Sequence, residues 1–262
     1  IAALRWLAES SPREALDALA QATRSPSDYR RQQAWQLIGT IPLPAAADLL
    51  ASGLVDLAKK NGVAPHAMEL IEAAGKRSEP VVKSALAAFV SAQNSSQDPL
   101  AKWLTALEGG DPSRGAELFE SHPAGQCMRC HASGHGGGDA GPDLSDIALR
   151  ADRRYLLEAL VNPAAEVAIG YGIASVTLNG GRSVSGIVVD DQPAHVDIDS
   201  AGEVYRIARG DIRMMTPPVS SMPPMAMILQ PAEIRDLVAW LAGQKAQPAK
   251  KSAHRKPVKL AP

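Results

Sequence analysis

The chain has 262 residues, of which 45% are hydrophobic and 21% charged, and its formal net charge is −1. This balance is typical of a folded globular protein and excludes a chain that is disordered along most of its length. No apolar run reaches the length of a bilayer, so we expect no transmembrane segment.

Residues 1–107 are predicted to form a series of short helices separated by Pro, Gly and Ser. Apolar residues recur at spacings of three and four, and prolines follow capping side chains, as at Ser11-Pro12 and Asp98-Pro99. Trp6 and Trp35 are expected in the core. Stacked helix pairs without strands resemble a HEAT-type α-solenoid, although an irregular helical bundle remains an alternative. The expected helices cover roughly 1–9, 12–23, 27–40, 44–60, 64–75, 79–93 and 98–107.

A short break at residues 108–112 leads into the next predicted helix, 113–120. Asp111 can cap this helix, with Pro112 at its first position. The pattern Gly115-x-x-Leu118-Phe119 is similar to the first helix of a small cytochrome c, in which the glycine lets a second helix approach closely.

The segment Cys127-Met128-Arg129-Cys130-His131 reads C-x-x-C-H, which is typical of covalent haem attachment. Two thiols one turn apart can bond to the vinyl groups of one porphyrin, and the adjacent imidazole can then ligate iron. A thioredoxin-like redox pair would need a βαβ context, which is missing here. A zinc site of Cys127, Cys130, His131 and His135 remains possible, although zinc sites usually separate the Cys pair from the His pair more widely.

The loop after this motif contains Gly141-Pro142-Asp143-Leu144, which resembles a segment of cytochromes c. The resemblance implies that the carbonyl of Pro142 accepts the Nδ1–H of the proximal His131, and that Leu144 packs on the haem face. Such a bond would orient the imidazole and make it a stronger ligand. His135, in the same loop, is a rival ligand that we expect instead to lie in solvent.

A helix is predicted over 151–163. After it the spacing of the apolar residues changes, because Val and Ile alternate with polar residues in the segments that follow. Turn signals at Asn179-Gly180-Gly181 and at 199–202 indicate hairpins. We expect a small curled sheet or an SH3-like barrel inserted at about 172–216. The five expected strands are 173–178, 183–190, 195–199, 203–208 and 211–215.

A Met-Pro pair at Met222-Pro223 precedes the last predicted helix, 231–241. The arrangement is similar to the end of a cytochrome c, and it implies that Met222 supplies a thioether to iron opposite His131. Met225 and Met227 are rival candidates, since a methionine here can also be apolar filling. Trp240 is expected to pack against Gly115 and Phe119 where the first and last helices of this domain cross.

The chain ends in a basic segment, 244–262, which we expect to be disordered. It is too short to predict nucleic-acid binding, and we expect no nucleic-acid partner. Its basic residues are Lys245, Lys250, Lys251, Arg255, Lys256 and Lys259.

Taken together, residues 109–243 resemble the C-terminal haem-binding, cytochrome c-like domain of large secreted proteins of planctomycete and verrucomicrobial type. The resemblance rests on the haem motif, the Gly141–Leu144 segment, the Gly170-Tyr171 pair before the β insertion and the Ser-x-Met-Pro loop. It implies a mainly α fold with a five-stranded β insertion, preceded by HEAT-like helices over 1–107.

The function expected from this resemblance is electron transfer by one covalent haem c, with iron between His131 and Met222. The chain would then be an electron carrier rather than an enzyme, with a fused or partner dehydrogenase as donor and a cytochrome or membrane acceptor. Two alternatives stay open, a five-coordinate haem peroxidase and a haem-based redox-sensing or binding module. Because haem is attached outside the cytoplasm, we expect a periplasmic or otherwise exported protein whose signal lies upstream of this chain.

Overall fold

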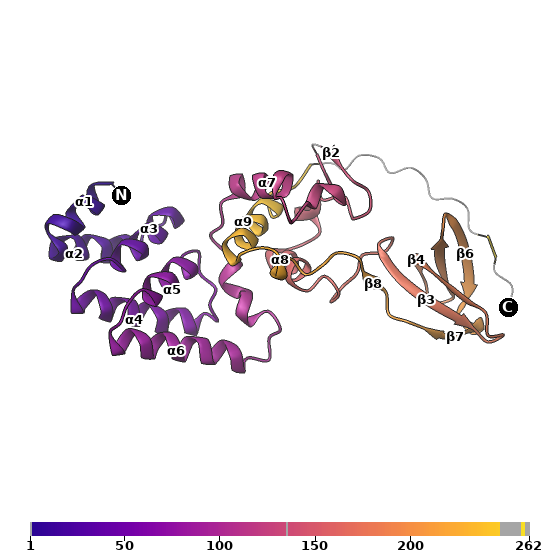
Figure 1. Ribbon diagram of the computed structural model, residues 1–262, viewed down its shortest axis with the longest axis horizontal. Coiled ribbons are helices and arrows are strands. Elements are labelled where there is room, and N and C mark those ends of the chain that lie inside the picture. The colour runs from indigo at the N-terminus through magenta and orange to yellow at the C-terminus, as the bar shows by residue number, and fades with distance from the viewer. Residues whose placement is uncertain (1, 135, 247–257, 260–262) are drawn as a thin grey trace. The chain divides into compact units, whose positions relative to one another are not determined.

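A computed structural model describes the chain except for residues 1, 135, 247–257 and 260–262 (Figure 1). It contains both helices and strands, and it divides into two compact units. The first unit comprises residues 1–118 and 230–243, and the second comprises 119–229 and 244–262. In the part that is described, no helix is long and apolar enough to cross a membrane.

The first unit begins with helices close to the predicted ranges, and α4 and α6 run side by side (Figure 1). Their boundaries follow the local signals, since α2, α4 and α6 each have proline in the first turn and the Ser27 hydroxyl accepts from the Arg30 N–H at the start of α3. The elements are α1 (Ala2–Ser10), α2 (Pro12–Ala22), α3 (Asp28–Ile38), α4 (Pro44–Lys59), α5 (Ala67–Gly75), α6 (Pro80–Ser95) and the 3-10 helix η1 (Ala101–Ala106).

The core of these helices is made of the apolar faces of α2 to α6. Trp35 is buried there as predicted, and its ring stacks on that of His66 with centroids 5.9 Å apart. The prediction for Trp6 is wrong, because its side chain is 68% exposed. Leu4 and Leu7 supply the face of α1 that packs on the core, which leaves Trp6 outside it.

Two further helices of this unit, α7 (Pro112–Ser121) and α9 (Pro231–Leu241), cross at Gly115. A β-carbon at Gly115 would lie 2.1 Å from the Asp236 carbonyl oxygen and 2.6 Å from the Trp240 β-carbon. The predicted contact between Gly115 and Trp240 is therefore confirmed. The capping prediction is also confirmed, because Asp111 Oδ1 accepts from the Ser113 N–H at 2.9 Å.

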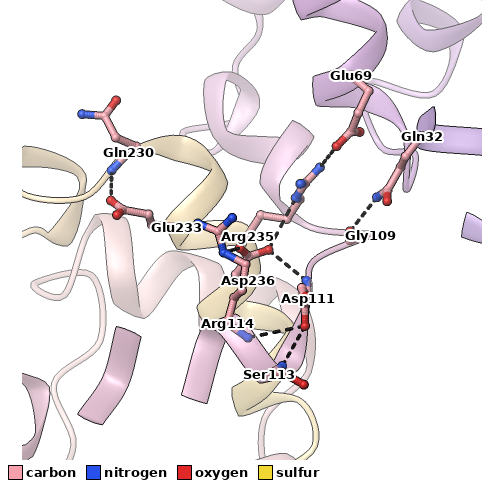
Figure 2. A network of polar contacts seen from close by, with 10 residues as sticks. All are labelled: Gln32, Glu69, Gly109, Asp111, Ser113, Arg114, Gln230, Glu233, Arg235 and Asp236. Atoms are coloured by element: carbon pink, nitrogen blue, oxygen red, sulfur yellow. Dashed lines mark hydrogen bonds and ion pairs between the residues drawn. The ribbon is translucent and has the colours of Figure 1, made fainter. Parts of the chain in front are cut away.

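Polar contacts join α9 to the helices before it, as Figure 2 shows. Asp236 Oδ1 accepts the backbone N–H of Asp111 at 2.9 Å, and the Arg235 guanidinium pairs with the buried Glu69 of α5 at 2.8 Å. The Gln32 side chain donates to the Gly109 carbonyl at 2.7 Å. The pair between Arg235 and Glu69 joins α9 to an N-terminal helix, whereas the sequence predicts α9 as the last helix of a 109–243 domain. The compact units therefore divide the chain at other residues than the predicted domains do.

The second unit contains the C-x-x-C-H segment, short elements around it and α8 (Arg153–Val161). The carboxylate of Asp152 caps α8 by accepting from the Tyr155 N–H at 2.8 Å. The short elements are η2 (Cys127–Arg129), β1 (Ala132–Ser133), β2 (Gly136–Gly137) and η3 (Ile147–Leu149).

The β insertion forms an antiparallel sheet from the five predicted strands (Figure 1). Its core is made of buried Val, Ile, Leu and Ala side chains. Its hydrogen-bonded order is β7-β3-β4-β5-β6-β9, with β8 beside β3, so the described strands form an open sheet rather than a closed barrel. The strands are β3 (Gly172–Leu178), β4 (Ser183–Asp191), β5 (His195–Ser200), β6 (Glu203–Ala208), β7 (Ile212–Met215), β8 (Val219–Ser220) and β9 (Val258–Lys259).

The C-terminal segment departs from the predicted disordered tail at β9, which pairs in parallel with β6. Here Val258 lies opposite Tyr205, and Lys259 lies opposite Arg206. Most of the rest of the predicted tail lies outside the described residues.

Candidate functional site

The two cysteines and His131 lie on one tight turn. The His131 N–H donates to the Cys127 carbonyl at 2.9 Å and the Cys130 N–H donates to the same oxygen at 3.1 Å, so the turn begins at Cys127. Gln126, the residue before the turn, has a left-handed backbone conformation with a φ of 43°. Both thiols are free, Cys127 half-buried and Cys130 exposed, and burial raises the pKa of Cys127. The turn thus presents two thiols and an imidazole from one short segment.

The His131 imidazole has a fixed partner on the loop that follows. Its Nδ1 lies 2.9 Å from the Pro142 carbonyl oxygen. A carbonyl can only accept, so Nδ1 carries the proton and Nε2 is the nitrogen with the free lone pair. Burial lowers the pKa of His131, with the Pro142 carbonyl opposing that shift, so the ring is held in the neutral form that binds metals. The contact expected between His131 and Pro142 is present.

Backbone hydrogen bonds hold the loop against the turn. The N–H of Gly138 donates to Met128 at 2.8 Å, that of Gly141 to Cys130 at 2.7 Å, and that of Leu144 to Ala132 at 2.8 Å. The loop therefore runs back alongside the C-x-x-C-H motif. The Pro142 carbonyl reaches the imidazole because Gly141 and Leu144, on either side of Pro142, are hydrogen-bonded to the motif and to Ala132.

Close approach explains the glycines of this loop. A β-carbon at Gly141 would lie 2.6–2.9 Å from three atoms of the His131 ring, and one at Gly138 would lie 2.1 Å from the Arg129 carbonyl oxygen. Gly137 combines a φ of 131° with a position against the His131 carbonyl. Side chains at these positions would displace the turn or the imidazole.

The Pro142–Leu144 segment has a support that sequence reasoning missed. Asp143 Oδ1 accepts from both the backbone N–H and the hydroxyl of Ser145, at 2.9 and 2.6 Å, and Ser145 is buried. The Asp143 carbonyl accepts from Arg150 at 2.8 Å. The Asp-x-Ser spacing, which favours such a turn, is the signal that could have indicated it. Leu144 itself is half-buried.

The three candidate methionines differ in burial. Met222 is half-buried, and its N–H donates to the Ser220 hydroxyl at 3.1 Å. Met225 is 4% exposed in the 3-10 helix η5 (Met225–Met227), which contacts α8, whereas Met227 is 83% exposed. Met225 is therefore part of a packed interior, and Met227 lies in solvent.

The described contacts bring together Cys127, Cys130, His131 and Pro142. For Met222 they define a local turn at Ser220, and its place opposite His131 stays a prediction. His135, the rival ligand, lies outside the described residues.

The donor set fits a haem attached through two thioethers. Paired thiols, an imidazole oriented through Nδ1 and a glycine where the loop passes the ring are consistent with such attachment. The same thiols and imidazole could contribute three ligands to zinc, and the fourth ligand considered from the sequence is His135. No protein-family model matches the chain, and comparison with curated proteins gives no significant match.

Proposed function

We propose that this chain is an electron-transfer protein with one haem c attached through Cys127 and Cys130. The observation that carries the proposal is the 2.9 Å contact between His131 Nδ1 and the Pro142 carbonyl, next to a turn that presents both thiols. A redox C-x-x-C pair has no need of this arrangement, whereas an imidazole that binds a metal through Nε2 does. Haem is favoured over zinc by the C-x-x-C-H spacing, in which the histidine directly follows the second cysteine. When bound, the haem supplies reversible one-electron exchange.

The chain's own residues fix how the iron would be held. His131 offers Nε2, because Nδ1 donates to Pro142, and the anchored loop prevents the ring from turning. Gly141 keeps the approach to the ring free of a side chain. These features favour an imidazole held in a single orientation, which limits rearrangement when the charge on the iron changes.

For the second axial ligand we propose Met222. Its half-buried side chain follows a turn fixed by the Ser220 hydroxyl, and Pro223 restricts the backbone after it. A methionine ligand raises the reduction potential and fills the position at which peroxide or oxygen would bind. An electron carrier is therefore favoured over a five-coordinate peroxidase.

The wider architecture fits the same proposal. We propose that α1 to α6 are a HEAT-like platform or spacer and that residues 109–243 are a cytochrome c-like domain with a β insertion. The electron donor would be a fused or partner dehydrogenase, and the acceptor a cytochrome or a membrane component. Covalent haem attachment implies an exported, periplasmic setting.

The first experiment is expression with a cytochrome c maturation system, followed by a pyridine haemochrome spectrum. We expect a spectrum of haem bound by two thioethers in the wild type, a spectrum of haem with one thioether in Cys127→Ala and in Cys130→Ala, and no covalent haem in the double variant. A correctly matured preparation without colour, or one that holds zinc in place of haem, would overturn the proposal.

The second experiment tests the axial methionine with a matched pair of variants. Met222→Ala is expected to abolish the methionine–iron charge-transfer band of the oxidised protein and to lower the potential, whereas the exposed Met227→Ala leaves both unchanged. A band that survives in Met222→Ala excludes Met222. A high-spin wild-type spectrum with peroxide turnover would instead support the peroxidase, and a potential that shifts with a bound ligand would support the sensing module.

A further inference from the structure

A second group of metal-ligating side chains lies on the β insertion, apart from the C-x-x-C-H turn. Within the described residues, Asp190, His195 and Asp197 place one ligand atom each within 4.8 Å of the other two. Asp190 is on β4 and lies directly opposite Asp197 on β5, after an irregularity in the register between Val188 and Asp190. His195 precedes Asp197 by two residues on the same strand, so both side chains project from one face.

The distances between these atoms suit a single small cation. His195 Nε2 lies 3.3 Å from Asp190 Oδ2 and 3.8 Å from Asp197 Oδ1. Ligands at about 2.0–2.2 Å from a tetrahedral zinc ion lie roughly 3.3–3.6 Å from one another. The first separation lies at the lower end of that range, the second lies slightly above it, and the Asp190 and Asp197 ligand atoms lie within 4.8 Å of each other. Side-chain adjustment toward a shared ion would therefore have to bring the two carboxylates closer together.

Neighbouring side chains orient both carboxylates and leave at least one lone pair free on each oxygen that faces His195. The Gln192 amide donates to Asp190 Oδ1 at 2.8 Å, which leaves Oδ2 toward the imidazole. Arg206 donates two hydrogen bonds to Asp197, from Nε to Oδ1 at 2.9 Å and from Nη2 to Oδ2 at 2.7 Å. A carboxylate has about four lone-pair sites, so Oδ1 of Asp197 can still bind a cation. Contacts of this kind around a ligand set its geometry.

The Arg206 guanidinium balances one of the two carboxylates, and a bound cation would balance the other. Two carboxylates directly opposite one another repel, and the side chain of Asp197 is only 5% exposed. His195 Nε2 is buried between them and makes no hydrogen bond of good geometry, although part of the ring remains exposed. A buried nitrogen without a hydrogen-bond partner is costly, and a divalent ion would bind this nitrogen and both carboxylates at once.

We propose that Asp190, His195 and Asp197 form a binding site for a divalent first-row transition metal, with Zn²⁺ as the ion that the geometry fits. One imidazole and two carboxylates provide three ligands, and water completes the coordination. Calcium and magnesium are disfavoured because they require more oxygen ligands and seldom use imidazole. The site would link β4 to β5 beside the register irregularity, and it is independent of the proposed haem site.

The test is calorimetric titration of Zn²⁺ into the full haem-loaded chain after dialysis against a chelator. We expect one zinc ion per chain in the wild type, with affinity reduced at least about tenfold in His195→Gln and Asp190→Asn. The matched control is Asp191→Asn, which removes the same charge one residue further along β4 from a carboxylate paired with Arg209. Its affinity for zinc should be within about threefold of that of the wild type, because losing a nearby charge lowers the affinity less than losing a ligand does.

A Cys127→Ser/Cys130→Ser variant carries no covalent haem, so it is compared with the haem-free wild type and separates this site from zinc binding at the cysteines. It should retain the zinc ion whose binding His195→Gln weakens. Far-ultraviolet circular dichroism establishes that each variant retains the sheet. The proposal fails if the wild type binds no zinc, if His195→Gln binds it equally well, or if the cysteine variant loses it.

Discussion

The substitution Gly141→Ala tests the support of the His131 imidazole most directly. The new β-carbon would lie 2.6 Å from Cε1, 2.7 Å from Nδ1 and 2.9 Å from Nε2 of the ring. Ordinary contacts between such atoms are about 3.5–4.0 Å, so the overlap is roughly 1 Å. Either the ring moves away from the Pro142 carbonyl or the loop moves away from the turn.

The expected cost follows from this overlap. Overpacking of a well-packed site costs about 1–3 kcal/mol, and loss of the bond between Nδ1 and the Pro142 carbonyl adds about 1 kcal/mol. We expect the midpoint of thermal unfolding to fall by several degrees. In the haem-loaded protein, a misplaced imidazole should also change the axial-ligand bands of the spectrum and shift the potential.

The matched control is Gly134→Ala, in the same loop, where an added β-carbon meets nothing within 4 Å. Thermal unfolding, monitored by circular dichroism, measures the loss of stability caused by overpacking. The haem spectrum is sensitive to the position of the imidazole. If Gly141→Ala matches both Gly134→Ala and the wild type in these measurements, the close approach of the loop to the ring is refuted.

Three further predictions concern the first unit and are each checked by thermal or urea unfolding. Gly115→Ala should cost about 1–3 kcal/mol or more, because its β-carbon would meet the Asp236 carbonyl at 2.1 Å, while Gly75→Ala, with nothing within 4 Å, should be tolerated. Arg235→Ala should cost about 3–5 kcal/mol by leaving Glu69 buried without its partner, whereas Lys76→Ala, which breaks an exposed pair with Glu72, should change stability by less than about 1 kcal/mol. Burial, with smaller effects of the nearby Arg31 and Lys60 opposed by Asp28, lowers the pKa of His66 to about 4. The unfolded chain therefore takes up this proton at a higher pH than the folded chain, so the stability due to neutral His66 is complete above about pH 6.5 and is lost as the pH falls toward 4. His66→Phe should flatten this dependence, and an unchanged pH profile would contradict it.

The sequence predicts local structure well where a chemical signal marks each boundary. Prolines at the first turns of α2, α4 and α6 place these helices, and alternating apolar residues with glycine turns place strands β3 to β7. The C-x-x-C-H spacing likewise predicts that both thiols and the imidazole share one turn, because that depends only on neighbouring residues.

Long-range pairing lies beyond such signals. Arg235 and Glu69 are 166 positions apart, and nothing near either residue indicates that α9 would pair with α5. The metal-ligand group on the sheet depends on a register irregularity in β4, since a shift by one residue would turn Asp190 away from His195 and Asp197. Trp6 shows the converse error, because an aromatic residue on an amphipathic helix need not lie on the buried face.

The axial methionine shows how burial refines a choice that spacing leaves open. The sequence offers Met222, Met225 and Met227 within six residues, and their spacing does not choose among them. Met225 is packed into the interior near α8, so using it as a ligand would open a cavity, which costs about 2–5 kcal/mol for a buried methionine. Met227 is 83% exposed, so using it as a ligand would cost the conformational entropy of its solvated side chain. Met222 avoids both costs, because it is half-buried after a turn that the Ser220 hydroxyl already holds. These costs support the proposal that Met222 is the ligand.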